Sequence, residues 1–193
     1  MPVIYVFLGL IASGKSTLAE RFADRYALPY YNTDRVRKEL AGLDEHQQQS
    51  DRYCQGIYTP EFSRKTYDEM LRRARLDIGS GKNGVVFDGS YHLREERDRV
   101  RRLADSLGGG ALFIHCVCSD DEVGNRLAQR AGDPHAVSDG RWEIYQVQKN
   151  LFQPPEELPA AELVTLDTER PVAELLTELT RNLNMQMVSG PDQ

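Results

Sequence analysis

Short unbroken apolar runs alternate along the chain with longer stretches whose apolar positions recur at helical spacing. The first run, residues 3–8, is rich in β-branched and aromatic side chains and predicts a strand that is buried on both faces. Apolar positions between Leu18 and Tyr26 then repeat as on an amphipathic helix. Further runs predict strands at 29–33, 85–87, 111–117 and 163–166, and helical spacing predicts helices at 34–40, 59–79, 93–107, 119–130, around 142–145 and at 172–183.

This order of elements indicates an α/β fold, because alternating strands and helices build a mostly parallel sheet with helices on both faces, in three layers. We find no internal repeat and no second core, so residues 1–184 are expected to form a single domain. Two polar segments interrupt the pattern, a glutamine-rich stretch at 41–58 and a turn-forming stretch at 131–140. Loops of such length are often functional flaps. Residues 185–193 are expected to be a disordered tail.

Composition narrows the class of protein. The chain has 193 residues, of which 40% are hydrophobic and 28% charged, as in a globular domain. No apolar run approaches the roughly 20 residues of a membrane span, and the start lacks the pattern of a signal peptide. The net charge of −6 argues against a dedicated nucleic-acid or membrane surface. Three cysteines indicate free thiols and a cytoplasmic location.

The loop after the first strand carries the strongest chemical signal. Residues 9–16 fit the pattern G-x-x-x-x-G-K-[ST] between a predicted strand and a predicted helix. This P-loop pattern lets backbone N–H groups surround a nucleotide phosphate at a helix N-terminus. Lys15 is expected to reach the β- and γ-phosphates, and the Ser16 hydroxyl to bind Mg²⁺. The expected nucleotide-binding residues are Gly9, Ile11, Ala12, Ser13, Gly14, Lys15, Ser16 and Thr17.

Asp88 follows the buried run 85–87, where the carboxyl ends of parallel strands meet. An apolar strand that ends in Asp is typical of the Walker B arrangement, in which the carboxylate holds Mg²⁺ directly or through water. The alternative is an ordinary turn residue before Gly89.

Asp34 also follows a predicted strand, with Arg37 one helical turn behind it. A carboxylate at this place could accept the proton of an attacking hydroxyl, while Arg37 holds the acceptor. The competing interpretation is that Asp34 only caps the short helix at 34–40.

Two arginines lie on one face of the helix at 119–130, because Arg126 and Arg130 are four residues apart. With Arg141 beyond the polar segment, they could neutralise charge on a transferred phosphoryl group when a lid closes. Alternatively, Arg126 and Arg130 form surface ion pairs with Asp121 or Glu122. The mixed-sign run at 94–102 predicts a solvated helix face.

Taken together, these motifs resemble the AAA-type P-loop kinase-like ATP-binding domains, some of which are fused to aminoglycoside-phosphotransferase-like domains. The resemblance extends over about residues 3–181. It rests on residues 9–17, 33–42, 56–61, 66–67, 86–90, 126–127, 130, 142–145, 148 and 166–168. The family often has Asp-Ala-Thr where this chain has Asp88-Gly89-Ser90, and a hydroxyl is kept at Ser90.

The resemblance implies a five-stranded sheet of order 2-3-1-4-5 and a short helical lid at about 131–141. It places Thr168 near the adenine and Ser90 among the acceptor contacts. The bacteriophage-type polynucleotide 5′-kinase domain, a similar protein, implies a general base at Asp34 and an acceptor-binding arginine at Arg37. It also implies transition-state arginines at Arg126 and Arg130. Gluconate kinases are similar in plan.

The sequence is therefore interpreted as that of an enzyme, a phosphotransferase that uses Mg²⁺ and ATP to phosphorylate a hydroxyl of a small molecule. Lys15, Asp34, Arg126 and Arg130 are the expected catalytic residues. A first alternative is a polynucleotide 5′-hydroxyl kinase, which the net negative charge disfavours. A second is an ATPase switch that transfers phosphate only to water. No guanine-specific N-K-x-D motif is present, which favours ATP.

Overall fold

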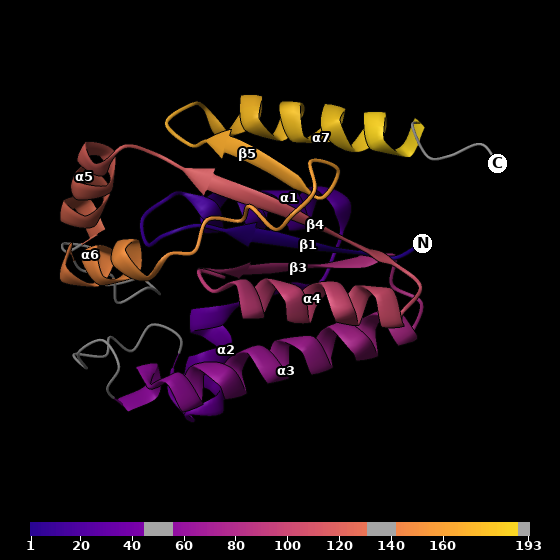
Figure 1. The fold of residues 1–193 in the computed structure, drawn as a ribbon, viewed down its shortest axis with the longest axis horizontal. Coiled ribbons are helices and arrows are strands. Elements are labelled where there is room, and N and C mark those ends of the chain that lie inside the picture. Colours follow the sequence, from indigo (N-terminus) through magenta and orange to yellow (C-terminus); the bar gives the residue numbers. More distant parts are fainter. Residues whose placement is uncertain (45–55, 131–141, 189–193) are drawn as a thin grey trace.

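The structure is a computed structural model that describes residues 1–44, 56–130 and 142–188. Strands and helices alternate along the chain (Figure 1). The strands are β1 (Val3–Leu8), β2 (Tyr30–Asn32), β3 (Gly84–Gly89), β4 (Gly110–Val117) and β5 (Leu163–Asp167). The helices are α1 (Lys15–Tyr26), α2 (Thr33–Leu40), the 3₁₀ helix η1 (Gly56–Tyr58), α3 (Pro60–Gly79), α4 (Arg94–Ser106), α5 (Asp120–Arg130), α6 (Trp142–Leu151) and α7 (Val172–Val188).

All strand pairs in the sheet are parallel, in the order β2-β3-β1-β4-β5. This confirms both the fold class and the strand order implied by the sequence. The register aligns Phe7 of β1 and Asn32 of β2 with Asp88 of β3. Residues that follow β1, β2 and β3 therefore meet at one edge of the sheet, where ligands of open parallel sheets bind.

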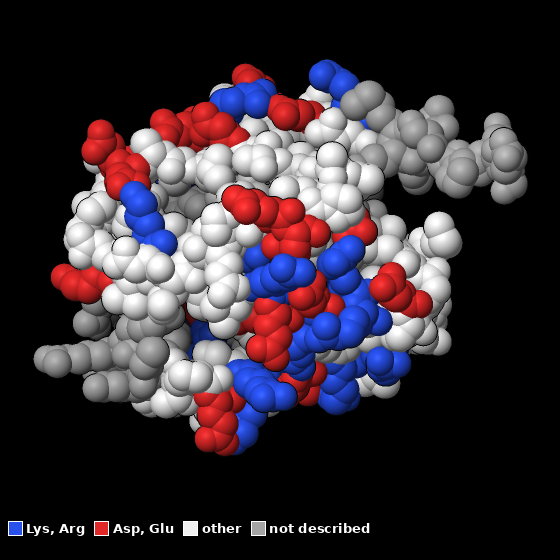
Figure 2. All heavy atoms as spheres, viewed as in Figure 1, with Lys and Arg blue, Asp and Glu red and all other residues white. Residues whose placement is uncertain are grey.

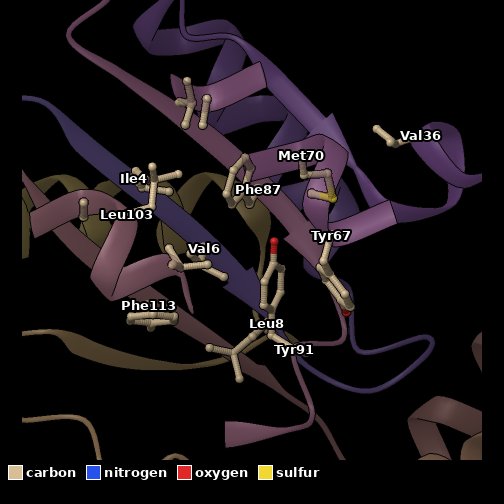
Figure 3. Close-up of a cluster of buried hydrophobic side chains, with 14 of the residues drawn as sticks. Ile4, Val6, Leu8, Val36, Tyr67, Met70, Phe87, Tyr91, Leu103 and Phe113 are labelled. Carbon is tan, nitrogen blue, oxygen red and sulfur yellow. The ribbon is translucent and has the colours of Figure 1, made fainter. Parts of the chain in front are cut away.

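Helices cover both faces of the sheet, which gives three layers (Figure 1). Successive residues of β1 point to opposite faces, as a strand requires. Ile4, Val6 and Leu8 pack with α3 and α4, and Figure 3 shows Met70 and Tyr67 of α3 beside them. On the other face, Phe7 packs against α1 and α7. The buried run at 3–8 thus reflects a central strand with a core on each side.

Several boundaries differ from the sequence prediction, of which two change the interpretation of the chain. Helix α2 begins at Thr33 instead of Asp34, because the Asn32 side chain accepts hydrogen bonds from the backbone N–H groups of Asp34 and Arg35 and caps the helix. The backbone of α7 stays helical to Val188, so the first part of the expected tail is helical. Residues 189–193 lie outside the described residues, as do 45–55 and 131–141, which include the predicted lid.

The mixed-sign run on α4 is only partly a solvated face. Figure 2 shows Lys and Arg interspersed with Asp and Glu on this side of the molecule, and Arg101 pairs with Glu162 at 2.8 Å. Arg97 is fully buried, in contrast to the prediction, and pairs with Glu157 at 2.5 Å. A guanidinium becomes buried when a partner carboxylate and carbonyl groups satisfy it, and here the carboxylate comes from a distant part of the chain.

Among the described residues, no helix is both long enough and apolar enough to span a bilayer.

Candidate active site

The phosphate loop joins β1 to α1 through an unusual backbone path. Gly14 precedes α1 with a φ of 80°, in the left-handed region that favours glycine. A Cβ atom at Gly14 would lie 2.9 Å from Nη1 of Arg126. At Gly9, a Cβ atom would lie 2.5 Å from the carbonyl oxygen of Cys116. Both motif glycines are therefore required by the close approach of neighbouring groups as well as by the loop itself.

Two polar side chains at the loop have little hydrogen bonding to the described part of the chain. The Ser13 hydroxyl is buried and has no hydrogen-bond partner among the described residues. Among the same residues, the Lys15 ammonium group has one hydrogen-bond acceptor, the carbonyl oxygen of Leu10, at 3.4 Å, near the limit for a hydrogen bond. Buried polar groups normally find partners, so the loop has the unfilled hydrogen-bonding capacity that a bound phosphate would satisfy.

Two cavities flank this loop, and Gly14 and Thr17 contribute to the walls of both. The larger has a volume of about 820 Å³ and is lined by Lys15, Ser16 and Asp34, among others. The smaller has a volume of about 400 Å³ and lies between α1, α5 and the segment that joins β5 to α7. The phosphate loop thus separates two spaces of the size that small ligands occupy.

Arg126 and Thr168 line the smaller cavity and hold the loop from outside. Arg126 donates to the carbonyl oxygens of Ala12 and Thr168, at 3.1 and 2.7 Å. The Thr168 hydroxyl donates to the Ser13 carbonyl at 2.6 Å. Arg126 also pairs with Glu122 at 2.7 Å, which is the ion pair that the sequence left open as an alternative. In this structure Arg126 therefore lies on the side of the smaller cavity, and its role in phosphoryl transfer stays a prediction.

Asp88 is completely buried at the end of β3. Its Oδ2 atom accepts hydrogen bonds from the Tyr30 hydroxyl at 2.7 Å and the Asn32 amide at 2.5 Å, whereas its Oδ1 atom has no partner among the described residues. Tyr30 and Asn32 line the larger cavity, and Asp88 is not among its lining residues. An unpartnered carboxylate oxygen suits the ligand chemistry of Mg²⁺, with a water between them.

Asp34 and Arg37 form an ion pair inside the larger cavity. Oδ1 of Asp34 lies 2.6 Å from Nη1 of Arg37, one turn further along α2. Because Asn32 caps the helix, the interpretation of Asp34 as the cap is wrong. The Arg37 side chain is 9% exposed and stacks over the Tyr58 ring at 4.8 Å, and its Nε has no partner among the described residues. The ion pair and Lys15 thus line the same cavity.

Ser90 also lines this cavity and belongs to a chain of polar side chains. Its hydroxyl is 3.0 Å from Nδ1 of His92 and 3.4 Å from the Tyr67 hydroxyl. The backbone between them is fixed at Tyr91, which has a φ of 42° and whose carbonyl accepts a hydrogen bond from Arg97 at 2.8 Å. Glu96 follows at the start of α4 and also lines the cavity.

Helix α6 contacts the phosphate loop and lines the larger cavity. The Gln148 side chain accepts a hydrogen bond from the Ile11 backbone N–H at 2.9 Å, and Gln148 lines the larger cavity. Ile11 and Ala12 of the loop pack with Tyr145 and with residues of α5 in a small apolar cluster. The Tyr145 hydroxyl donates to Asp120 at 2.7 Å, which ties α6 to α5.

Sequence reasoning did not identify several of these residues. Asn32 could have been found from its place before a helix, where Asn is a preferred cap. Glu96 and His92 were passed over because a charged run and a scattered histidine carry no local signal of burial. Gln148 belonged to the family resemblance without an assigned contact. Arg130 ends α5, but its side chain, like all of Arg141, lies outside the described residues.

A sequence profile described as "AAA domain" matches residues 4–155, which is most of the chain. The chain belongs to this AAA-domain family. Curated relatives of this chain include an uncharacterized protein of Mycobacterium bovis, which is 32% identical over 120 residues. The aligned part covers 62% of this chain and 24% of that protein. The chain spans about a quarter of the length of such mycobacterial relatives. An adenylate kinase of Mycobacterium sp. is 29% identical over 149 residues, with 73% of this chain and 78% of the enzyme covered.

Solved structures show that this AAA domain has the fold of P-loop kinases. A kinase from Chloroflexus aurantiacus, described as putative, superposes with a TM-score of 0.71 at 19% identity, covering 94% of this chain and 98% of that one. A sugar kinase from Janibacter sp. gives 0.66 at 18% identity, with 95% of each chain covered. A gluconokinase from Sinorhizobium meliloti gives 0.59 at 22% identity, covering 96% and 97%.

Proposed function

We propose that this protein is an ATP-dependent phosphotransferase that moves the γ-phosphoryl group of Mg-ATP to a hydroxyl of a small molecule. The observation that carries the proposal is the placement of the phosphate loop between two cavities, with Lys15 and the Asp34–Arg37 pair in the walls of the larger one. A simple ATPase needs only a nucleotide and water. A second cavity of about 820 Å³ provides room for an acceptor.

The nucleotide is assigned to the phosphate loop, with its base on the side of the smaller cavity. Backbone N–H groups of the loop and the N-terminus of α1 would hold the phosphates. Arg126 and Thr168 support this side because both bond to carbonyl groups of the loop. Adenylate kinases among the relatives and kinases among the structural neighbours support ATP as the nucleotide.

Mg²⁺ is assigned to Ser16 and, through water, to Asp88. The unpartnered Oδ1 atom of Asp88 is the observation that fits such an ion. When bound, the ion would neutralise charge on the β- and γ-phosphates. Tyr30 and Asn32 hold the other carboxylate oxygen and so fix the orientation of Asp88.

Asp34 is assigned as the group that orients the acceptor hydroxyl and takes its proton. One oxygen of Asp34 is held by Arg37, and the other has no hydrogen-bond partner among the described residues. Since phosphoryl transfer depends mainly on positioning and charge stabilisation, the fixed geometry of this pair matters more than the strength of the base. Ser90, which lines the same cavity, is assigned to contact the acceptor.

The test is ADP release from Mg-ATP over a panel of sugars, nucleosides, aminoglycosides and 5′-hydroxyl oligonucleotides. Lys15→Ala should abolish turnover, whereas Lys82→Ala, an exposed lysine, should not. Asp34→Asn should abolish acceptor phosphorylation and leave ATP binding largely intact, with Asp24→Asn, an exposed position on α1, as its control. Wild-type transfer by Asp34→Asn would show that Asp34 is not the base.

The same panel separates the alternatives. A polynucleotide 5′-kinase would phosphorylate oligonucleotides with a strong dependence on salt. An ATPase switch would release ADP at a rate that no acceptor increases.

A further inference from the structure

Glu96 is a nearly buried carboxyl group in the wall of the larger cavity. Its side chain is 12% exposed. One oxygen, Oε2, accepts a hydrogen bond from the Leu93 backbone N–H at 3.2 Å, in the first turn of α4. The other oxygen, Oε1, has no hydrogen-bond partner among the described residues. Because Glu96 lines the cavity, a ligand there can reach this oxygen.

The arginines around Glu96 are already paired with other carboxylates. Arg37 binds Asp34 at 2.6 Å, Arg97 binds Glu157 at 2.5 Å, and Arg99 binds Asp68. Within the described residues, no arginine or lysine forms an ion pair with Glu96. A buried carboxylate is normally paired with a cation or fully hydrogen-bonded. Among the described residues, Glu96 differs from the neighbouring carboxylates because only its Oε2 atom has a hydrogen-bond donor and no arginine or lysine pairs with it.

His92 does not supply the missing positive charge. Its Nδ1 atom lies 3.9 Å from Oε2 of Glu96 and 3.0 Å from the Ser90 hydroxyl. Burial, together with the nearby Arg97, lowers the pKa of His92, so the ring is neutral at neutral pH. Burial also raises the pKa of Glu96 to about 7, because the cost of desolvation outweighs the Leu93 hydrogen bond and the nearby arginines, which favour the ionised form.

We infer that Glu96 binds the acceptor at a second point: its free carboxylate oxygen accepts a hydrogen bond from a hydroxyl other than the one that is phosphorylated. The acceptor is then a polyhydroxy compound with at least two hydroxyl groups. This inference rests on the proposed function, because it assigns the larger cavity to the acceptor.

The charges of the cavity favour a neutral hydroxyl over an ammonium group at this point. Among the described residues of the walls, cationic side chains outnumber carboxylates: Lys15, Arg21, Arg35, Arg37, Arg64 and Arg99 against Glu20, Asp34, Glu95 and Glu96. Such an excess suits phosphates and disfavours a cationic acceptor. A carboxylate or phosphate on the acceptor would be repelled by Glu96 itself. A hydroxyl avoids both penalties and gains a charge-assisted hydrogen bond.

The contact makes acceptor binding depend on pH. The groups that face Glu96 are Arg37 on α2, Tyr67 on α3, Tyr91 and His92 before α4, and Arg97 and Arg99 on α4. A hydroxyl that donates to the ionised form of Glu96 binds less well once that carboxylate is protonated. The acceptor KM should therefore rise as the pH is lowered from 8 to 6.

The test uses Glu96→Gln, whose amide oxygen can still accept from Leu93 while the ionised oxygen is lost. Glu95→Gln is the matched control, an exposed neighbour in the same cavity wall. Glycerol, erythritol, ribose, glucose and inositol are compared with their deoxy and amino-for-hydroxyl analogues. Wild-type protein should prefer the parent compound over one deoxy analogue by about tenfold or more in KM, and Glu96→Gln should lose this preference and the rise at low pH.

Binding of the same compounds is also measured by calorimetry with ADP present, which does not depend on turnover. Polyols that bind with a Glu96-dependent preference but are not phosphorylated would support the inference and contradict the proposed function. If acceptors with a single hydroxyl are phosphorylated as efficiently as polyols, the proposed function is supported and the inference about Glu96 is contradicted. The inference is overturned if none of the five polyols binds, if amino analogues bind better, or if Glu96→Gln behaves as Glu95→Gln does.

Discussion

Replacement of Arg97 by methionine should destabilise the protein more than replacement of any surface arginine of α4. The Arg97 side chain is completely buried and binds Glu157 through two nitrogens, at 2.5 and 3.0 Å. It also donates to the carbonyl oxygen of Tyr91 at 2.8 Å. Methionine replaces the aliphatic stem of the arginine but has no hydrogen-bond donor. Arg97→Met therefore leaves the Glu157 carboxylate, 6% exposed, without its partner.

The expected loss follows from the cost of an uncompensated buried charge. Removal of one partner from a buried ion pair lowers the free energy of unfolding by about 3–5 kcal/mol. For a chain of this size, that loss corresponds to a fall of roughly 10 °C in Tm. The control is Arg101→Met, whose ion pair with Glu162 is about one-third exposed on each side and should contribute about 1 kcal/mol or less.

The assay is urea unfolding followed by circular dichroism at pH 7, for Arg97→Met, Arg101→Met and the double variant Arg97→Met/Glu157→Met. Removal of both charges should recover much of the loss, because an apolar pair can replace a buried ion pair. Two results would refute the reasoning. One is a loss of unfolding free energy in Arg97→Met that is no larger than the loss in Arg101→Met. The other is a double variant that is less stable than Arg97→Met instead of more stable.

Three further predictions concern the site. Glu96→Gln should be more stable than wild type at pH 8 but not at pH 5. The pKa of Glu96 is raised from 4.5 to about 7 in the folded protein, so the wild type loses unfolding free energy as the pH rises from 4.5 to 7. The loss is complete above pH 7 and amounts to about 3 kcal/mol at most. Urea unfolding at both pH values checks this, and a difference independent of pH would contradict it. Gln148→Ala leaves the Ile11 N–H without its acceptor and should lower the free energy of unfolding by about 1 kcal/mol. Gln148→Glu keeps an accepting oxygen and should lower it less. Equal losses in urea unfolding would mean that this hydrogen bond is unimportant. Gly14→Ala should cost about 1–2 kcal/mol, because alanine is strained at a φ of 80° and its Cβ would crowd Arg126, and thermal unfolding at wild-type Tm would disprove the strain.

Much of the fold could be predicted because the signals are local. A strand buried on both faces is an unbroken apolar run, and a helix on its surface repeats its apolar positions within each turn. The phosphate loop is equally local, since its glycines, Lys15 and Ser16 are contiguous. The strand order came from the family resemblance, and the structure confirms it.

The sequence alone also placed Asp34, Asp88 and Ser90 after strands, where the edge of a parallel sheet collects side chains. It could not assign their partners. From the sequence, Asp34 could be either a general base or the cap of the helix that follows. The structure excludes the cap, because the Asn32 side chain accepts the hydrogen bonds from the first backbone N–H groups of this helix. Asp88 is held by Tyr30, which is 58 residues away along the chain.

The tertiary structure decided which charged groups are buried. Arg97 and Glu96 belong to a run that by composition predicts a solvated face, yet one is buried against Glu157 and the other forms the wall of a cavity. Burial depends on what packs over a helix, and here the covering segments come from other parts of the chain. The amino-acid sequence therefore determined the elements and the phosphate loop, because these depend on neighbouring residues. Long-range packing decided the partners of the buried charges and the shape of the larger cavity.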